Sequence, residues 1–229
     1  MLSPNMSGVN SRTRGCWLRS LALGGLFFSS VIYAAAPDPN AQLWTEIDGI
    51  AQITQRVDVT GAVYGRAAEG FPTPELSAAS LAVDLTIRGT ILTAGDLEAR
   101  IRSVSRLATN VNLPFVSATF LVPVGPAIVS DRNRLERIYG VPGSPFRYRN
   151  RLTAELPVAG GSAFTAVEVS DEVFYDVSRH RWTRNRAQAS TVWQVGRHSE
   201  LLVYLLDQRD VIASPHDLHV LGLTLRFKL

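Results

Sequence analysis

Apolar and polar residues alternate along much of this chain, with the period of two that is typical of β-strands whose faces meet different surroundings. In residues 81–88, LAVDLTIR, the odd positions are all apolar, and the even positions carry Ala, Asp, Thr and Arg. Residues 146–156, FRYRNRLTAEL, place arginine at three alternate positions, and residues 221–229, LGLTLRFKL, close the chain in the same manner. The pattern predicts an all-β protein, because helical periodicity is scarce after residue 43.

Eleven segments are predicted to be strands, and many of them reach ten residues or more. Strands of soluble proteins usually have about 5–6 residues, whereas crossing a bilayer at a tilt takes about 9–11. The lengths favour a single antiparallel up-and-down outer-membrane β-barrel of about 10–12 strands, with twelve preferred because bacterial barrels usually have an even number. The segments are 43–53, 56–67, 79–90, 96–107, 113–122, 127–138, 146–157, 164–175, 182–195, 199–207 and 217–229.

Residues 1–36 have the pattern of a secretory signal peptide. A positive region with three arginines precedes an apolar stretch that begins at Leu21 and ends in Ala34-Ala35-Ala36. This stretch is shorter than the roughly 20 residues of a membrane-spanning helix, and cleavage is expected between positions 34 and 36. The lone cysteine, Cys16, falls inside this leader. We therefore expect two regions, a signal peptide at 1–36 and a transmembrane barrel at 37–229.

The basic residues are almost all arginine, since Lys228 is the one lysine among 23 basic residues. Three of the arginines lie in the leader, so the remainder of the chain contains 20 basic and 20 acidic residues. A neutral mature chain argues against a nucleic-acid partner, which would need a net basic surface. No later stretch is apolar for long enough to form a transmembrane helix.

Assumed positions of the hairpin turns predict which charged residues of 127–175 lie opposite one another on adjacent strands. A turn centred on 141–142 pairs positions whose numbers add to 283, and a turn centred on 160–161 pairs those that add to 321. Both registers keep the charges on one face, which a shift of one residue would destroy. The first turn pairs Arg132 with Arg151, Arg134 with Arg149 and Glu136 with Arg147, and the second pairs Arg149 with Glu172, Arg151 with Ser170 and Thr153 with Glu168.

This shared face is expected to line a polar lumen, because outer-membrane barrels are polar inside and apolar toward lipid. Arginine suits such a network, since its planar fork stays charged and gives several donors. Asn133, Asn150 and Asn185 interrupt the opposite, lipid-facing phase and run against the expectation. The predicted network consists of Arg132, Arg134, Glu136, Arg147, Arg149, Arg151, Glu168, Glu172, Arg184 and Arg186.

Four stretches together resemble an uncharacterised outer-membrane barrel family, catalogued as domain of unknown function twenty-four ninety. They are LWTEID at 43–48, the arginine-rich hairpin at 132–157, DEVFYDVSRHRWTRNRAQA at 171–189 and HVLGLTLRFKL at 219–229. The resemblance implies an outer-membrane location and implies no activity. The chain departs from the common barrel ending, because Phe227 is followed by two further residues.

Catalytic and metal-binding patterns are weak. His198 and Ser199 point to opposite faces of an extended strand, and His216 and His219 lack a third ligand nearby, so we predict no catalytic residue, no metal and no cofactor. The leading hypothesis is a non-enzymatic barrel in the outer membrane of a Gram-negative cell, either structural or a narrow conduit for small anionic or polar solutes. The expected partners are outer-membrane lipids, the barrel-assembly machinery and such solutes. The alternatives are an outer-membrane lipid-modifying hydrolase and a soluble periplasmic lipocalin-like binder.

Overall fold

The computed structural model describes residues 40–68, 76–102, 108–140, 146–159, 163–212 and 216–229, and the signal-peptide prediction for 1–36 lies outside them. Within these ranges the protein is all-β, and none of its elements is a helix long and apolar enough to cross a membrane. The strands are β1 (Ala41–Gln52), β2 (Val57–Ala68), β3 (Leu76–Ile87), β4 (Thr90–Arg102), β5 (Ala108–Asn112), β6 (Phe115–Val124), β7 (Ala127–Arg137), β8 (Phe146–Pro157), β9 (Phe164–Asp176), β10 (Arg181–Gly196), β11 (Ser199–Asp210) and β12 (Asp217–Lys228).

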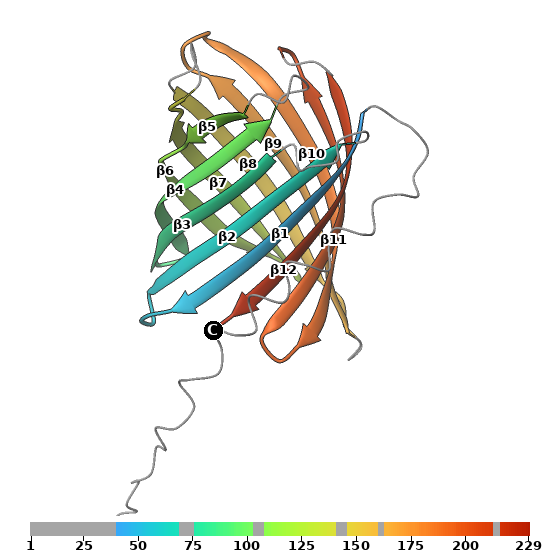
Figure 1. The fold of residues 1–229 in the computed structure, drawn as a ribbon. Helices are drawn as coiled ribbons and strands as arrows, with labels where there is room; N and C mark the ends of the chain where they lie inside the picture. Colours follow the sequence, from blue (N-terminus) through green and yellow to red (C-terminus); the bar gives the residue numbers. More distant parts are fainter. Residues whose placement is uncertain (1–39, 69–75, 103–107, 141–145, 160–162, 213–215) are drawn as a thin grey trace, which may run out of the picture. The chain divides into compact units, whose positions relative to one another are not determined.

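The twelve strands form one closed barrel (Figure 1). Neighbours run in the order β3-β2-β1-β12-β11-β10-β9-β8-β7-β6-β4-β5, and pairing of β3 with β4 closes the sheet. The short β5 and the longer β6 both pair with β4, one beyond the other, so they share a single place in the wall. The barrel wall therefore has eleven places for its twelve strands.

Closure is parallel between β1 and β12, with Ala41 opposite His219 and Ile50 opposite Lys228. The expectation of an antiparallel pairing throughout is wrong at this seam. Neighbouring strands alternate in direction around the barrel. Because the number of strand positions is odd, the first and last strands must run in the same direction. The predicted total of twelve strands is confirmed.

The strand that the sequence pattern did not predict is β5, which falls between two of the predicted strands. The chain between β5 and β6 contains Pro114, which has no N–H to donate to a ladder. The carbonyl of Pro114 instead accepts from the amide of Arg137 at 3.0 Å, and Leu113 exchanges both backbone bonds with Leu97. The proline thus separates two short strands that follow one another along β4.

The predicted register of β7 on β8 is confirmed, with Arg132 opposite Arg151 and Arg134 opposite Arg149. The predicted register of β8 on β9 is wrong by two residues, because Arg151, rather than Arg149, lies opposite Glu172. Thr153 accordingly faces Ser170 instead of Glu168. A shift of two keeps every side chain on its predicted face.

The two faces of the sheet differ sharply in composition. Leu81, Leu152 and Leu205 are 63%, 52% and 68% exposed, whereas Glu136 and Glu172 are 3% and 5% exposed. We call the two sides the exposed face and the buried face. Large aliphatic side chains thus lie on the side where water-soluble proteins usually place charge.

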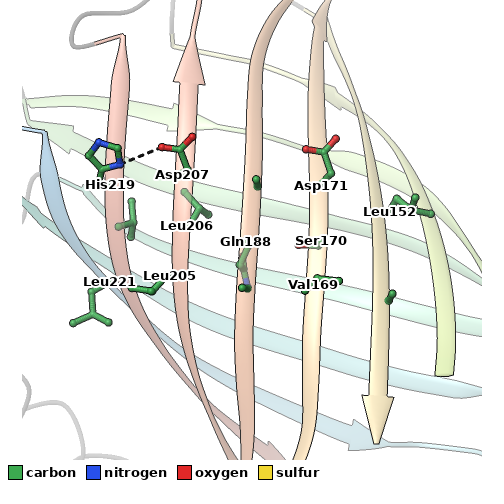
Figure 2. A pocket seen from close by; sticks show the side chains of 14 residues that line it. Leu152, Val169, Ser170, Asp171, Gln188, Leu205, Leu206, Asp207, His219 and Leu221 are labelled. Carbon is green, nitrogen blue, oxygen red and sulfur yellow. Dashed lines mark ion pairs between the residues drawn. The ribbon is translucent and has the colours of Figure 1, made fainter. Parts of the chain in front are cut away.

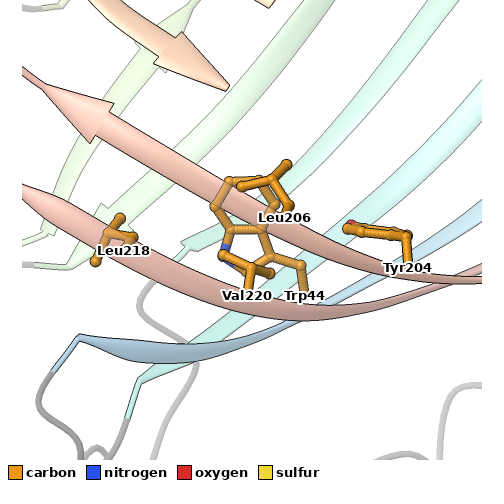
Figure 3. Packing of buried hydrophobic residues seen from close by; sticks show 5 residues of the cluster. All are labelled: Trp44, Tyr204, Leu206, Leu218 and Val220. Atoms are coloured by element: carbon orange, nitrogen blue, oxygen red, sulfur yellow. The ribbon is translucent and has the colours of Figure 1, made fainter. Parts of the chain in front are cut away.

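The buried face also carries an apolar cluster near the β1–β12 seam, formed by Trp44, Tyr204, Leu206, Leu218 and Val220 (Figure 3). The Tyr204 ring lies against Gly222 on the neighbouring strand, where an added Cβ would overlap ring carbons. Glycine at 222 is what lets this aromatic ring lie flat over β12.

Connections are shorter at the rim where β12 ends, which we call the exit rim. Residues 88–89, 125–126 and 197–198 are two-residue turns there. Arg88 and Gly89 have φ values of 47° and 81°, the left-handed pair that a tight hairpin turn of the primed type requires. Connections at the other rim, where β1 begins and which we call the entry rim, run from four residues at 177–180 to eight at 138–145.

Candidate functional arginine network

Strands β7 to β10 bring the predicted charges together on the buried face. Alternate side chains of a strand point the same way, and the registers align these alternate positions across four strands. Two glutamates, Glu136 on β7 and Glu172 on β9, form the centres of the resulting ion pairs.

Glu136 is contacted by three guanidinium groups. Arg147 donates from Nε to Oε2 at 2.8 Å, and Arg149 donates to Oε1 at 2.6 Å. Arg134, on the same strand as the glutamate, lies 3.8 Å from Oε1. One buried carboxylate thus compensates charge from three arginines.

Glu172 is shared in the same way. Arg132 donates to its Oε1 at 3.0 Å, and Arg149 reaches the same oxygen at 2.8 Å. Arg186 lies 3.8 Å from Oε2. Arg149 therefore bridges both glutamates, although the predicted register that placed it opposite Glu172 was two residues off.

Arg184 pairs with a residue outside the predicted network. It pairs with Asp210 on β11, to which its Nε donates at 2.6 Å. The register of β10 on β11 puts Arg184 directly opposite Asp210, while an irregularity in the pairing with β9 follows Trp182. The strand predicted at 199–207 stops short of Asp210, so the aspartate was not among the predicted network residues.

Arg151 and Glu168 occupy the same face with weaker links to the rest. Arg151 donates to Gln188 at 3.5 Å, and Glu168 lies opposite Glu155 in the pairing of β8 with β9. Glu168 is thus two positions nearer the exit rim than Ser170, away from the crowded glutamate centres.

Aromatic faces complete the arrangement. Phe174, only 1% exposed, has four guanidinium carbons within 4.7–5.4 Å of its ring centre. Arg66 lies 3.8 Å over the Trp44 ring, and Arg186 lies 5.0 Å from the same ring. Such cation–π contacts stabilise guanidinium groups that are removed from water. The four arginines around Phe174 are Arg147, Arg149, Arg184 and Arg186.

Positive charge exceeds negative charge in this cluster, which we call the arginine network. It holds seven arginines and three carboxylates. The contacts given above join six of the arginines to a carboxylate, and Arg151 lies on the same face beside Gln188. The members are Arg132, Arg134, Glu136, Arg147, Arg149, Arg151, Glu172, Arg184, Arg186 and Asp210. The arrangement can attract and hold anions, and its donors are of the forked type that matches oxyanions.

Most of this chain matches one known protein family. Residues 41–218, from the start of β1 into β12, match the family described as "Protein of unknown function (DUF2490)". The chain belongs to the DUF2490 family. No curated protein matches its sequence. The part shared with DUF2490 includes the whole arginine network.

The exposed face of this DUF2490 protein carries a groove of about 790 Å³ over β8 to β12 (Figure 2). Alanines at 154, 187 and 189 are among its lining residues, together with larger side chains such as Leu205 and Leu221. Asp207 and His219, 3.1 Å apart, are at one end of the groove. The groove is apolar along most of its length and polar at this end.

Asparagines on the exposed face have local partners. Asn150 donates to Asp131 at 2.5 Å, and Asn185 donates to Asp171 at 2.7 Å. Asn133 accepts from the hydroxyl of Tyr148 at 2.5 Å. These pairs lie toward the entry rim, so the asparagines that interrupt the apolar phase form a polar zone at one end of the strands.

The weak catalytic candidates are placed apart. His198 lies in an exposed turn, and Glu200 pairs with Lys228 at 2.5 Å. His216 contacts the backbone carbonyl of Asp210, whereas His219 contacts Asp207. In the described ranges no three His, Cys, Asp or Glu side chains are grouped as metal ligands.

Proposed function

We propose that this protein is an integral outer-membrane β-barrel whose lumen is lined by the arginine network and admits small anionic solutes. The observation that carries the proposal is the contrast between the faces, with aliphatic side chains exposed and ion-paired arginines buried. In a bilayer, that exposed face would contact hydrocarbon, and the barrel would leave no unpaired sheet edge in lipid.

Strand length supports the membrane assignment. Most strands have 10–16 residues, while crossing a bilayer takes about 9–11. We prefer this reading to a lipocalin-like binder, because such a binder needs an apolar interior for its ligand, and here the arginine network lies within the closed sheet. Outer-membrane lipids and the barrel-assembly machinery would then be partners.

The location is tested by fractionation and by gel mobility. We expect the protein in the outer-membrane fraction, with a band that migrates differently before and after boiling. Recovery in the soluble periplasmic fraction would contradict the proposal and favour the binder.

The excess of arginine supports a preference for anions, and Arg151 offers the cleanest test. Its contact is with the neutral Gln188, so Arg151→Gln removes charge without breaking an ion pair with a carboxylate. We expect the ratio of anion to cation permeability in planar bilayers to fall about twofold, because fixed charge sets the local ion concentration. The measurement is the reversal potential in a salt gradient.

Arg209→Gln is the matched control, since its side chain is 76% exposed on the other face. It should leave the reversal potential unchanged. A barrel that passes no current would contradict the conduit and leave a structural role, and equal effects of both substitutions would contradict the role of the arginine network.

A lipid-modifying hydrolase is the second candidate, favoured by the His219–Asp207 pair beside the apolar groove. Ser170 also lines the groove. Because it is next to Asp171 in β9, its side chain points to the opposite face of the sheet, away from the His219–Asp207 pair. A water molecule would therefore be the nucleophile. Fatty-acid release from phospholipid in detergent, lost in His219→Ala, would establish this activity.

A further inference from the structure

Charge on the buried face divides into two zones along the strands. All seven arginines of the arginine network lie five or more residues from the exit-rim end of their strand. Six carboxylates of the same face lie within four residues of that end, and we call them the exit acids. Each belongs to the phase of its strand that carries buried side chains, such as Trp44 on β1 and Leu202 on β11. The exit acids are Asp48, Asp58, Asp84, Glu155, Glu168 and Glu200.

Cations compensate only part of the charge of the exit acids. Lys228 pairs with Glu200 at 2.5 Å, and Arg226 lies 3.6 Å from Glu200 and 3.8 Å from Asp48. Among the residues that the structure describes, the other four exit acids have no ion pair. The strand registers place these four as two directly opposed pairs of like charge, Asp58 with Asp84 and Glu155 with Glu168.

Other charged side chains do not cancel this division. Three arginines beyond the strand ends, at 56, 88 and 197, are exposed in exit-rim turns, where salt screens their charge. Glu46 lies between the two zones, and the hydroxyl of Thr224 is 3.5 Å from its carboxylate. Toward the entry rim, Arg66 and Asp176 add one charge of each sign. The buried face is therefore positive toward the entry rim and negative toward the exit rim.

We propose that the barrel conducts ions directionally, with a larger current when anions are driven from the entry rim to the exit rim than in reverse. This directional conduction rests on the proposed function, since it needs an open lumen. Fixed charge raises the local concentration of the opposite ion and excludes ions of its own sign. When the exit side is positive, anions enter through the arginine network and cations enter past the exit acids, so each ion first meets the zone that attracts it. When the voltage is reversed, each ion first meets the zone that repels it, and the lumen is depleted of both.

Single-channel current in planar bilayers tests this preference. In about 0.1 M potassium chloride, where charge acts over about 10 Å, we expect the currents at equal and opposite voltages to differ about twofold or more. In about 1 M salt the reach of the charges falls to about 3 Å, and the ratio of the two currents should approach one. Outside the leader the chain has no cysteine, so Arg197→Cys places a single thiol in an exit-rim turn. A charged thiol reagent added to one chamber then identifies the side that the exit rim faces.

Substitutions in each zone test the residues. Glu155→Gln combined with Glu168→Gln neutralises one opposed pair of exit acids, so the ratio of the two currents should fall toward one. This variant should fold, because it relieves a direct opposition of like charges. Arg151→Gln weakens the positive zone and should also lower the ratio. Glu98→Gln, exposed on β4, is the matched control and should keep the ratio of the parent.

The heat-dependent gel shift verifies that each variant is folded, independently of its current. A steady current that is equal at both polarities in dilute salt, or larger in the opposite direction, would overturn directional conduction and leave the proposed conduit standing. Equal ratios in the parent and in the doubly substituted variant would overturn the role of the exit acids. A folded barrel that passes no current at either polarity would contradict the conduit and directional conduction together.

Discussion

Replacing Glu172 with Gln is expected to lower the free energy of unfolding by about 3–5 kcal/mol, the usual cost of removing one partner from a buried ion pair. The carboxylate is 5% exposed and lies close to Arg132, Arg149 and Arg186. Its loss leaves three guanidinium groups facing a neutral amide of the same shape. Urea titration of the folded barrel, followed by tryptophan fluorescence, measures the change.

Glu98→Gln is the matched control for this experiment. Glu98 is exposed and belongs to β4, outside the arginine network. The same change of chemistry there should alter stability by less than about 0.5 kcal/mol. If Glu172→Gln and Glu98→Gln cost the same, the buried network does not hold the barrel together.

Gly222→Val is expected to destabilise the barrel by about 3 kcal/mol or more, at the upper end of what overpacking costs. A Cβ at position 222 would overlap the ring of Tyr204, and the ring is held in the cluster with Trp44 and Leu206. The ring cannot move aside without disturbing that cluster. The same urea titration, together with loss of the heat-dependent gel shift, measures the effect.

Removing the ring should rescue the variant. Tyr204→Ala combined with Gly222→Val should be more stable than Gly222→Val alone, because the added methyl groups then fill vacated space. Gly49→Ala, whose Cβ would come no closer than 3.9 Å to another atom, should be tolerated. A Gly222→Val barrel as stable as the parent would show that Tyr204 does not depend on this glycine.

Alternation along the strands was enough to predict which residues share a face. The period of two is local, so the arginines of 146–156 fall together whatever the exact pairing. The register of β7 on β8 was also predicted correctly, including the opposed pair Arg132 and Arg151. The chemistry of these pairs could then be anticipated from sequence alone.

Features set by distant strands were not predictable in this way. Asp210 was missed as the partner of Arg184 because the end of β11 was placed three residues early. Phe174 lies in the charged phase of β9, and nothing local to its sequence indicates that four arginines surround it. Trp44 and Arg66 come near the arginines of the later strands only because the barrel closes. Its closure pairs β1 with β12 and so places β1 and β2 beside the last strands of the chain.

The parallel seam has a consequence for experiments on sidedness. An even wall returns its last strand to the side from which the first one started, but here Ala41 and Lys228 end up at opposite rims. Twelve residues of strand separate these rims by about 40 Å, at about 3.3 Å per residue before tilt. For the proposed membrane barrel, epitopes inserted next to the two positions should therefore be reached by antibody from different sides of the bilayer, and a short linker could not join them into a circular permutant.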